Sequence, residues 1–183
     1  MDEQMDVTNT VTPDRILELE DRPDWALDLL DFELHSNAFR DGQRIPPRYT
    51  ADGDDLSPAL AWGRPPEGTK SLALVVDDPD APGGLFTHWM VLGLPAAPGD
   101  LVEGRGTDPS DVAGAQTLTN DFDRVGWASP APPRGHPQHR YRFRLLALDN
   151  EPRLPSSSRR GDFDQAIEGH VIGETILTGH YGR

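Results

Sequence analysis

The residues whose types and spacing favour chemistry lie in a loop between two apolar runs, in the stretch VVDDPDAPGGLFTHWMVLGLP from Val75 to Pro95. Asp78 and Asp80 are separated by one proline in this loop, and His88 follows at the start of the second apolar run. Proline rings fix φ, so the backbone that carries the two carboxylates is stiff. Carboxylates and an imidazole exchange protons readily, which suits them to general acid and base chemistry. The loop therefore predicts a preorganised site at the end of two buried strands.

A second segment of similar composition, PPRGHPQHRY from Pro132 to Tyr141, also combines proline and glycine with a terminal histidine, His139. Like the first loop, it precedes a predicted strand. If the two loops meet at one end of a sheet, His139 converges with Asp78, Asp80 and His88 on one small pocket. The two segments together indicate a single site.

Short strands divided by turns must position these loops. Residues 72–76 and 88–94 are continuous apolar runs of the kind that form central strands. In HRYRFRLLALD, residues 139–147 alternate, with an apolar set on one face and arginines on the other. Shorter strands are expected at 32–35 and 115–118. Only the C-terminal region favours a helix, whose buried side would contain five residues: Phe163, Ala166, Ile167, His170 and Val171.

This pattern predicts a mainly β fold, an antiparallel β-sandwich with a short C-terminal helical segment. Residues 1–31 form an acidic N-terminal extension that we expect to be partly ordered. Within it, Thr12-Pro13-Asp14 resembles a helix start, and a packed segment is expected near Trp25-Ala26-Leu27. Residues 32–183 then form one domain.

The charge balance excludes several classes of partner. The chain has 31 acidic and 17 basic residues in 183, a net charge of −14, and Lys70 is its single lysine. Such a surface repels nucleic acid phosphates and anionic lipid headgroups. An Asp-rich, Lys-poor surface stays hydrated at high salt, so we expect a halophilic protein.

The sequence also lacks cysteine, a signal peptide and a membrane-spanning segment. No cysteine is present, which excludes disulfides, a thiol nucleophile and a thiolate metal site. The N-terminus lacks the features of a signal peptide, and no apolar run is long enough to span a membrane. We therefore expect a cytoplasmic protein.

Three further clusters each have a functional and an ordinary interpretation. Arg140, Arg142 and Arg144 resemble a row of phosphate ligands, but in so acidic a chain pairing with surface carboxylates is the favoured interpretation. The aspartates at 52, 54 and 55 resemble half of a calcium loop without its downstream glutamate, so a solvated surface is favoured there. His136 and His139 resemble a metal pair, but proline lies between them and no cysteine or glutamate joins them, so no metal is expected.

Several motifs of this chain resemble those of a known protein family. DPDAP, the following HW, and the later PPRG and HRY resemble the two signature regions of the phosphatidylethanolamine-binding protein family, also called the Raf kinase inhibitor protein family. AFRDGQRIPPRYTADGDDLSPALAW, PEGTKSLALVVDDPDAP and HVIGETILTGHYGR are similar to its bacterial and archaeal branch. The resemblance covers residues 32–183, and several motifs in the same order make chance agreement improbable. It implies a sandwich of antiparallel sheets with a shallow anion pocket at one end.

The resemblance also implies a set of ligand-binding residues. Two positions depart from the family pattern at the entry to the second signature, where Ser129 and Ala131 stand in place of the usual Gly-Pro-x-Pro. Phe86 stands where relatives often have a tryptophan beside the pocket. The implied anion-binding residues are Asp78, Asp80, Phe86 and His88 from the first signature and Pro133, Gly135, His139 and Tyr141 from the second.

In such a pocket the carboxylates would orient the histidines. A carboxylate that accepts a bond from one ring nitrogen of His88 or His139 fixes the tautomer and leaves the other N–H to donate to an anion. We expect the carboxylates to raise the pKa of these histidines above its ordinary value of about 6.5. One carboxylate would face the ammonium group of a zwitterion such as phosphoethanolamine.

The leading hypothesis is a non-catalytic protein without cofactor or metal that binds a small anion of the phosphate, phosphoethanolamine or carboxylate type. It would regulate a protein kinase or protease as an inhibitor, alone or as a homodimer. The alternative is a hydrolase of phosphate or acyl esters in which Asp78, His88 and His139 exchange protons. No G-x-S-x-G elbow and no P-loop supply a nucleophile for it. A third hypothesis is a protein inhibitor whose contact surface is formed by the loops between Arg105 and Arg134.

Overall fold

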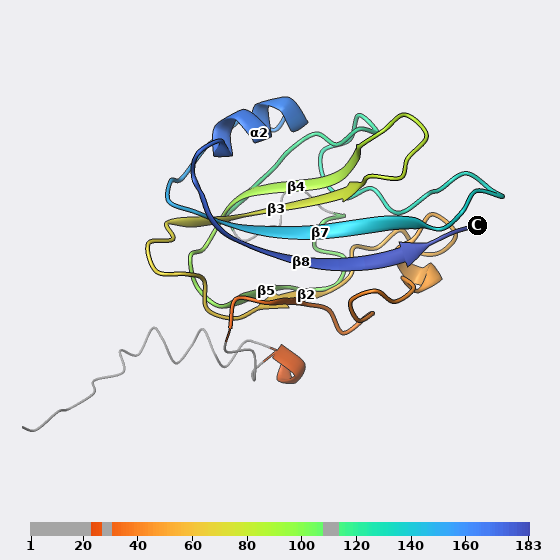
Figure 1. Cartoon of the computed structure of the whole chain (residues 1–183), viewed down its shortest axis with the longest axis horizontal. Coiled ribbons are helices and arrows are strands. Elements are labelled where there is room, and N and C mark those ends of the chain that lie inside the picture. The colour runs from red at the N-terminus through yellow and green to blue at the C-terminus, as the bar shows by residue number, and fades with distance from the viewer. Residues whose placement is uncertain (1–22, 27–30, 108–113) are drawn as a thin grey trace, which may run out of the picture.

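The computed structural model describes residues 23–26, 31–107 and 114–183, and it confirms the mainly β fold with two antiparallel sheets and one short helix near the C-terminus (Figure 1). The smaller sheet has the order β1-β2-β5, formed by Leu34–His35, Leu60–Trp62 and Gly99–Leu101. The larger sheet has the order β6-β4-β3-β7-β8, formed by Gln116–Thr117, Phe86–Leu94, Ser71–Asp78, His139–Leu148 and Val171–Tyr181. The helix α2 spans Arg160–Ile167, and the 3₁₀ turns η1 and η2 span Asp24–Ala26 and Pro47–Tyr49.

The smaller sheet and α2 lie on opposite sides of the larger sheet and bury both faces of its central strand β3, whereas the outer side chains of β8 and of part of β7 remain exposed or half-buried (Figure 1). Successive residues of a strand point to opposite faces, so each strand contributes to two cores. On β7, Phe143 and Leu145 enter the core between the sheets, whereas Leu146 packs under α2. Phe163 and Ile167 are the residues by which α2 covers its face of the sheet. This explains why β3 is buried along its whole length.

The predicted strands at 72–76, 88–94 and 139–147 are confirmed as β3, β4 and β7, each slightly longer than expected. The predicted segments at 32–35 and 115–118 contain the two-residue strands β1 and β6. The strands β2 and β5 were not predicted, since each has only three residues.

The prediction for the C-terminal region was wrong beyond Ile167. The helix ends there, and His170 and Val171 lie outside it; residues 171–181 form β8, the longest strand in the described residues. This strand could not be recognised in the sequence because two of its positions that face the core between the sheets are glycines. A side chain at Gly173 would meet Pro66 at 2.7 Å, and one at Gly179 would meet Ile45. Neighbouring elements approach these two positions too closely for a side chain. The strand therefore lacks the alternating apolar residues by which it could have been recognised.

The N-terminal predictions are only partly within the described residues. Ala26 is fully buried and Trp25 partly so, while Leu27 and the expected helix start at Thr12 lie outside the described residues. In the described part of the chain, no helix combines the length and hydrophobicity that crossing a membrane requires.

Candidate functional site

A cavity of about 200 Å³ opens at one end of the sandwich, where β3 ends and β4 and β7 begin. Six of the eight predicted ligand-binding residues line it: Asp78, Phe86, His88, Pro133, His139 and Tyr141. The other two, Asp80 and Gly135, lie outside its lining. The structure thus brings the two predicted loops together at one end of the larger sheet.

A β-bulge in β4 turns His88 toward this cavity. Val76 of β3 pairs with Trp89 and Asp77 pairs with Thr87, so His88 is an additional residue without a partner on β3. A bulge of this kind lets two consecutive side chains share a face, and bulges commonly re-aim a side chain at a functional site. The bulge is held by Asp121, whose carboxylate accepts the Thr87 N–H at 2.7 Å and whose own N–H donates to the Thr87 carbonyl at 3.0 Å.

The cavity floor contains a buried carboxylate–imidazole pair. His139 Nδ1 donates to Asp78 Oδ2 at 2.7 Å, and both side chains are almost fully buried. The other carboxylate oxygen, Asp78 Oδ1, accepts the backbone N–H of Asp80 at 2.8 Å. Because both oxygens have partners within the protein, Asp78 is fixed in place and orients the ring of His139. His139 Nε2 is left as the ring nitrogen available to a ligand.

His88 is oriented by a backbone group. Its Nδ1 donates to the carbonyl of Ala128 at 2.7 Å, so Nε2 is an acceptor while the ring is neutral and a donor once it is protonated. Burial lowers the pKa of His88, and this outweighs the carbonyl of Ala128 and the charge of Asp78, which act in the opposite direction. The expectation that the carboxylates would raise this pKa was therefore wrong for His88.

Tyr141 adds a hydroxyl to the floor. The hydroxyl is buried and has no hydrogen bond of normal geometry among the described residues, although it lies close enough to the Asp78 carboxylate to interact with it. The ring lies edge-on to His88 at 5.3 Å and is stacked on His139 at 6.5 Å between centroids. Burial, followed by the charge of Asp78, raises the pKa of Tyr141, so the hydroxyl keeps its proton and remains a donor.

The two predicted residues outside the lining have structural partners instead. Asp80 accepts the backbone N–H of Arg140 at 2.9 Å and its guanidinium at 2.9 and 2.8 Å. These hydrogen bonds lower the pKa of Asp80 to about 2 and fasten its loop to β7. Gly135 adopts φ of +78° in a turn, and its N–H donates to the backbone oxygen of Arg183 at 3.0 Å.

Sequence reasoning missed Phe122, which is 45% exposed and forms part of the cavity wall. Its ring lies edge-on to Phe86 at 4.7 Å and to His88 at 5.7 Å. No periodicity marks this residue, because it lies in a turn that Asp121 anchors to β4. Four small or cyclic residues complete the lining: Ala81, Pro82, Ala131 and Pro132.

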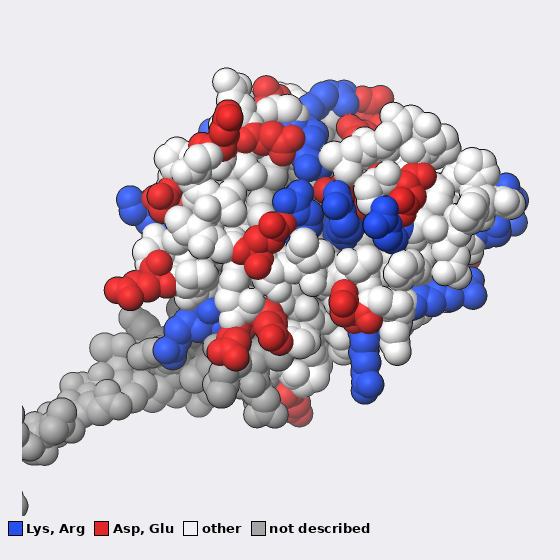
Figure 2. Space-filling view, in the orientation of Figure 1, with Lys and Arg blue, Asp and Glu red and all other residues white. Residues whose placement is uncertain are grey.

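The arginines on the opposite face of β7 do pair with carboxylates, as predicted. Arg142 contacts Asp77 at 2.8 Å, with Arg144 at 3.8 Å and Arg160 of α2 at 3.4 Å from the same carboxylate. Asp77 is fully buried, so it is not the surface carboxylate that we expected. Figure 2 shows basic side chains in a row over the middle of this face, with acidic ones around them.

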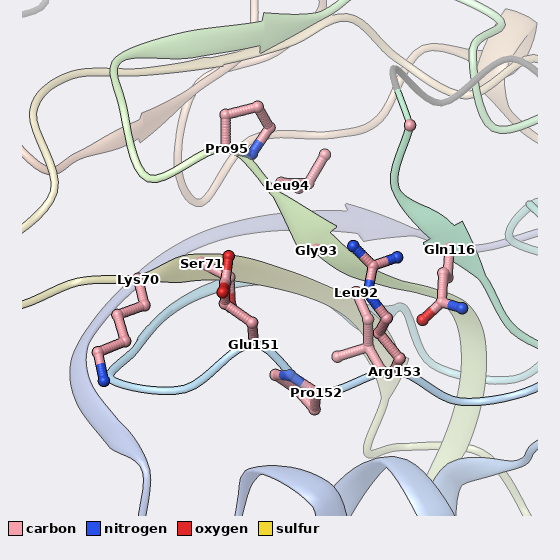
Figure 3. A pocket seen from close by; sticks show the side chains of 11 residues that line it. Lys70, Ser71, Leu92, Gly93, Leu94, Pro95, Gln116, Glu151, Pro152 and Arg153 are labelled. Carbon is pink, nitrogen blue, oxygen red and sulfur yellow. The ribbon is translucent and has the colours of Figure 1, made fainter.

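A second cavity, of about 80 Å³, lies at the opposite ends of β3 and β4 (Figure 3). Its polar lining consists mainly of side chains at its edges, Lys70, Gln116, Glu151 and Arg153, and it contains no histidine. Among the described residues, no group of three or more His, Asp or Glu side chains could hold a metal ion. The cavity at the end of β3 is the candidate site because it contains the buried Asp78–His139 pair.

Comparison with known proteins identifies the family to which the chain is related. Residues 35–182 match the family model described as phosphatidylethanolamine-binding protein. A UPF0098 protein of Aquifex aeolicus is 43% identical over 152 residues, which covers 82% of this chain and 88% of the relative. The UPF0098 protein YbhB of Escherichia coli is 40% identical over 154 residues, covering 79% of this chain and 90% of the relative.

Solved structures show the same fold. Escherichia coli YbcL, described as a new member of the mammalian PEBP family, superposes with a TM-score of 0.78 at 31% identity, covering 84% of this chain and 99% of that one. The PEBP homologue CT736 of Chlamydia trachomatis gives a TM-score of 0.74 at 32% identity, covering 84% and 98%. The chain therefore belongs to the phosphatidylethanolamine-binding protein family, in its prokaryotic YbhB and YbcL branch.

Proposed function

We propose that this protein binds a small phosphate-type anion in the cavity at the end of β3 and does not transform it chemically. The observation that carries the proposal is the group of donors on the floor. His139 is oriented by a buried carboxylate, and beside it the Tyr141 hydroxyl has no hydrogen bond of normal geometry in the described residues. An anion bridging these two groups would satisfy the buried hydroxyl, which is costly to leave without a hydrogen bond.

The charge on the floor implies that a proton accompanies the anion. Asp78 contributes one negative charge, and burial lowers the pKa of His88 so that its ring is neutral near pH 7. A phosphate dianion would therefore meet little net positive charge. Binding is favoured when a histidine or the ligand itself is protonated, so affinity should rise as the pH falls from about 8 to 6.

The cavity lining argues against covalent catalysis. Among the described residues, the lining contains no serine, threonine, cysteine or lysine, and both oxygens of Asp78 are engaged by the protein. A hydrolase would have to use His88 or His139 as a base for water. Binding without reaction needs no such step, and this supports the non-catalytic proposal. Inhibition of a kinase or protease, and a homodimeric state, remain predictions from the family resemblance.

Calorimetric titration at high KCl tests the proposal with phosphate, phosphoethanolamine and acetate as ligands. His139→Ala should weaken phosphate binding about ten- to a hundredfold, since one charge-assisted hydrogen bond contributes roughly 1.5–3 kcal/mol. Arg142→Ala, on the opposite face of the same strand, is the control and should bind normally. Equal affinities for these two variants would exclude His139 from the site.

Phosphorus NMR of phosphoethanolamine incubated with the protein tests the absence of chemistry. The spectrum should show one bound species and no release of inorganic phosphate. Release that depends on His88 or His139 would favour the hydrolase instead.

A further inference from the structure

One wall of the ligand cavity consists of Ala131, Pro132 and Pro133, preceded by Pro130. Proline has no backbone N–H, so three of these four residues have no main-chain donor with which to anchor the segment. Their carbonyls can still accept hydrogen bonds, and donors from elsewhere must therefore fix the position of this wall.

Arg183 supplies the donors for the two central carbonyls, while backbone N–H groups of Ala51 and His136 donate to those of Pro130 and Pro133. Its Nε donates to the carbonyl of Pro132 at 2.8 Å, and its Nη2 reaches the carbonyl of Ala131 at 3.5 Å. Its backbone oxygen accepts the N–H of Gly135 at 3.0 Å, just beyond the wall. A planar guanidinium presents its donors in a fixed fork, so it can hold two neighbouring carbonyls in one orientation.

Asp52 fixes the guanidinium from its other side. Asp52 Oδ1 lies 3.3 Å from Arg183 Nη1, and Asp52 Oδ2 accepts the hydroxyl of Tyr181 at 2.7 Å. The hydrogen bond from Tyr181, followed by those from Arg183, lowers the pKa of Asp52, so the carboxylate is ionised at neutral pH. The aspartate that resembled part of a calcium loop thus has a structural partner next to the cavity.

The same acidic turn also fixes the entry to the wall. Asp55 Oδ1 accepts the N–H of Ser129 at 3.2 Å and, in addition, the Ser129 hydroxyl. The N–H of Ala51 donates to the carbonyl of Pro130 at 3.0 Å. Asp55 therefore holds both the backbone and the side chain of Ser129 at the start of the wall.

We propose that Arg183, Asp52 and Asp55 form a brace that positions the Ala131–Pro133 wall for ligand binding. None of the three lines the cavity, so they act through the wall as positioning residues. The inference rests on the proposed function, because the brace matters only if the cavity takes a ligand. A binding site keeps its geometry only where the groups around it are themselves held in place.

The test compares Arg183→Ala, Arg183→Lys and Asp52→Asn with wild type, using inorganic phosphate as the probe. Arg144→Ala is the matched control, since Arg144 is also a partly exposed arginine with two acidic partners, on the far face of β7. Phosphate affinity should fall about tenfold, or roughly 1.4 kcal/mol, in the three brace variants and stay unchanged in the control. Millimolar methylguanidinium should restore the phosphate affinity of Arg183→Ala, because it can occupy the position of the missing guanidinium.

A measurement made without ligand tests the brace independently of phosphate binding. Amide hydrogen exchange at Gly135 should accelerate in Arg183→Ala and remain slow in the Arg144→Ala control. Full affinity in Arg183→Lys would overturn the proposal, since charge without the fork would then suffice. Unchanged exchange at Gly135 would overturn it as well. If wild type itself binds no phosphate, the proposed function fails, and the exchange data still decide whether the brace exists.

Discussion

Replacing Tyr141 with phenylalanine tests whether its hydroxyl binds the ligand or stabilises the fold. The variant keeps the ring, which packs against His88 and His139, and removes only an oxygen that has no hydrogen bond of normal geometry among the described residues. No protein hydrogen bond is lost, so the free energy of unfolding should stay constant or rise by up to about 1–3 kcal/mol, the cost of a buried unsatisfied polar group. Most buried tyrosines would show the opposite sign.

Phosphate affinity should move the other way in the same variant. A hydrogen bond to a charged acceptor contributes roughly 1.5–3 kcal/mol, which corresponds to about a ten- to hundredfold loss of affinity. Calorimetric titration gives the affinity, and urea unfolding of the same samples gives the stability. The reasoning is refuted if Tyr141→Phe binds phosphate as tightly as wild type, or if it loses stability and affinity together.

Three other outcomes are expected. Because burial lowers the pKa of His88, the unfolded chain binds more protons below pH of about 6.5, so wild type should lose stability as the pH falls through that range, and His88→Gln should lose less in parallel urea titrations. Gly179→Val should cost about 1–3 kcal/mol, because its side chain would meet Ile45 and Phe39, whereas Gly161→Ala in open space should not destabilise; thermal melts of both variants decide this. Melting temperatures in low and multimolar KCl should differ widely if the aspartate excess marks a halophilic protein, and equal values would contradict that expectation.

The strongly patterned strands could be predicted because their burial leaves a regular trace. On β7, the alternation of Tyr141 and Phe143 with arginines encodes one face toward the core between the sheets and one toward the outer cluster around Asp77. The strand β8 left no such trace, since Gly173 and Gly179 occupy inward positions where other elements approach closely. Strands are predicted from the alternation of their side chains, and at these two positions the packing leaves no room for a side chain.

The site was predictable only as far as residue types could show it. Asp78 and His139 are 61 residues apart, and loop composition together with family resemblance suggested that they meet. Composition could not distinguish Asp78 from Asp80, although one orients His139 and the other pairs with Arg140. That difference depends on the path of the loop after β3, which is a tertiary property.

The electrostatic prediction failed for a related reason. Nearby aspartates suggested a raised pKa for His88, but the sequence does not reveal how completely β4 buries the ring. Desolvation opposes the charged form of a histidine and outweighs distant carboxylates. Phe122 was missed because a turn residue gains its role only from the contacts that the fold provides.

The additional residue at His88 also affects how related sequences are compared. Side chains before it alternate in one phase and those after it in the other, so deleting His88 would bring both parts of β4 into a single phase. Phe86 would remain opposite Asp78 and Thr87 opposite Asp77, and only the additional inward side chain would be lost. Point substitutions can change the cavity gradually, whereas the deletion of this one residue would remove the bulge together with the side chain that it turns into the cavity. An alignment that places a gap between Phe86 and Trp89 therefore implies a different cavity, even when every aligned residue is identical.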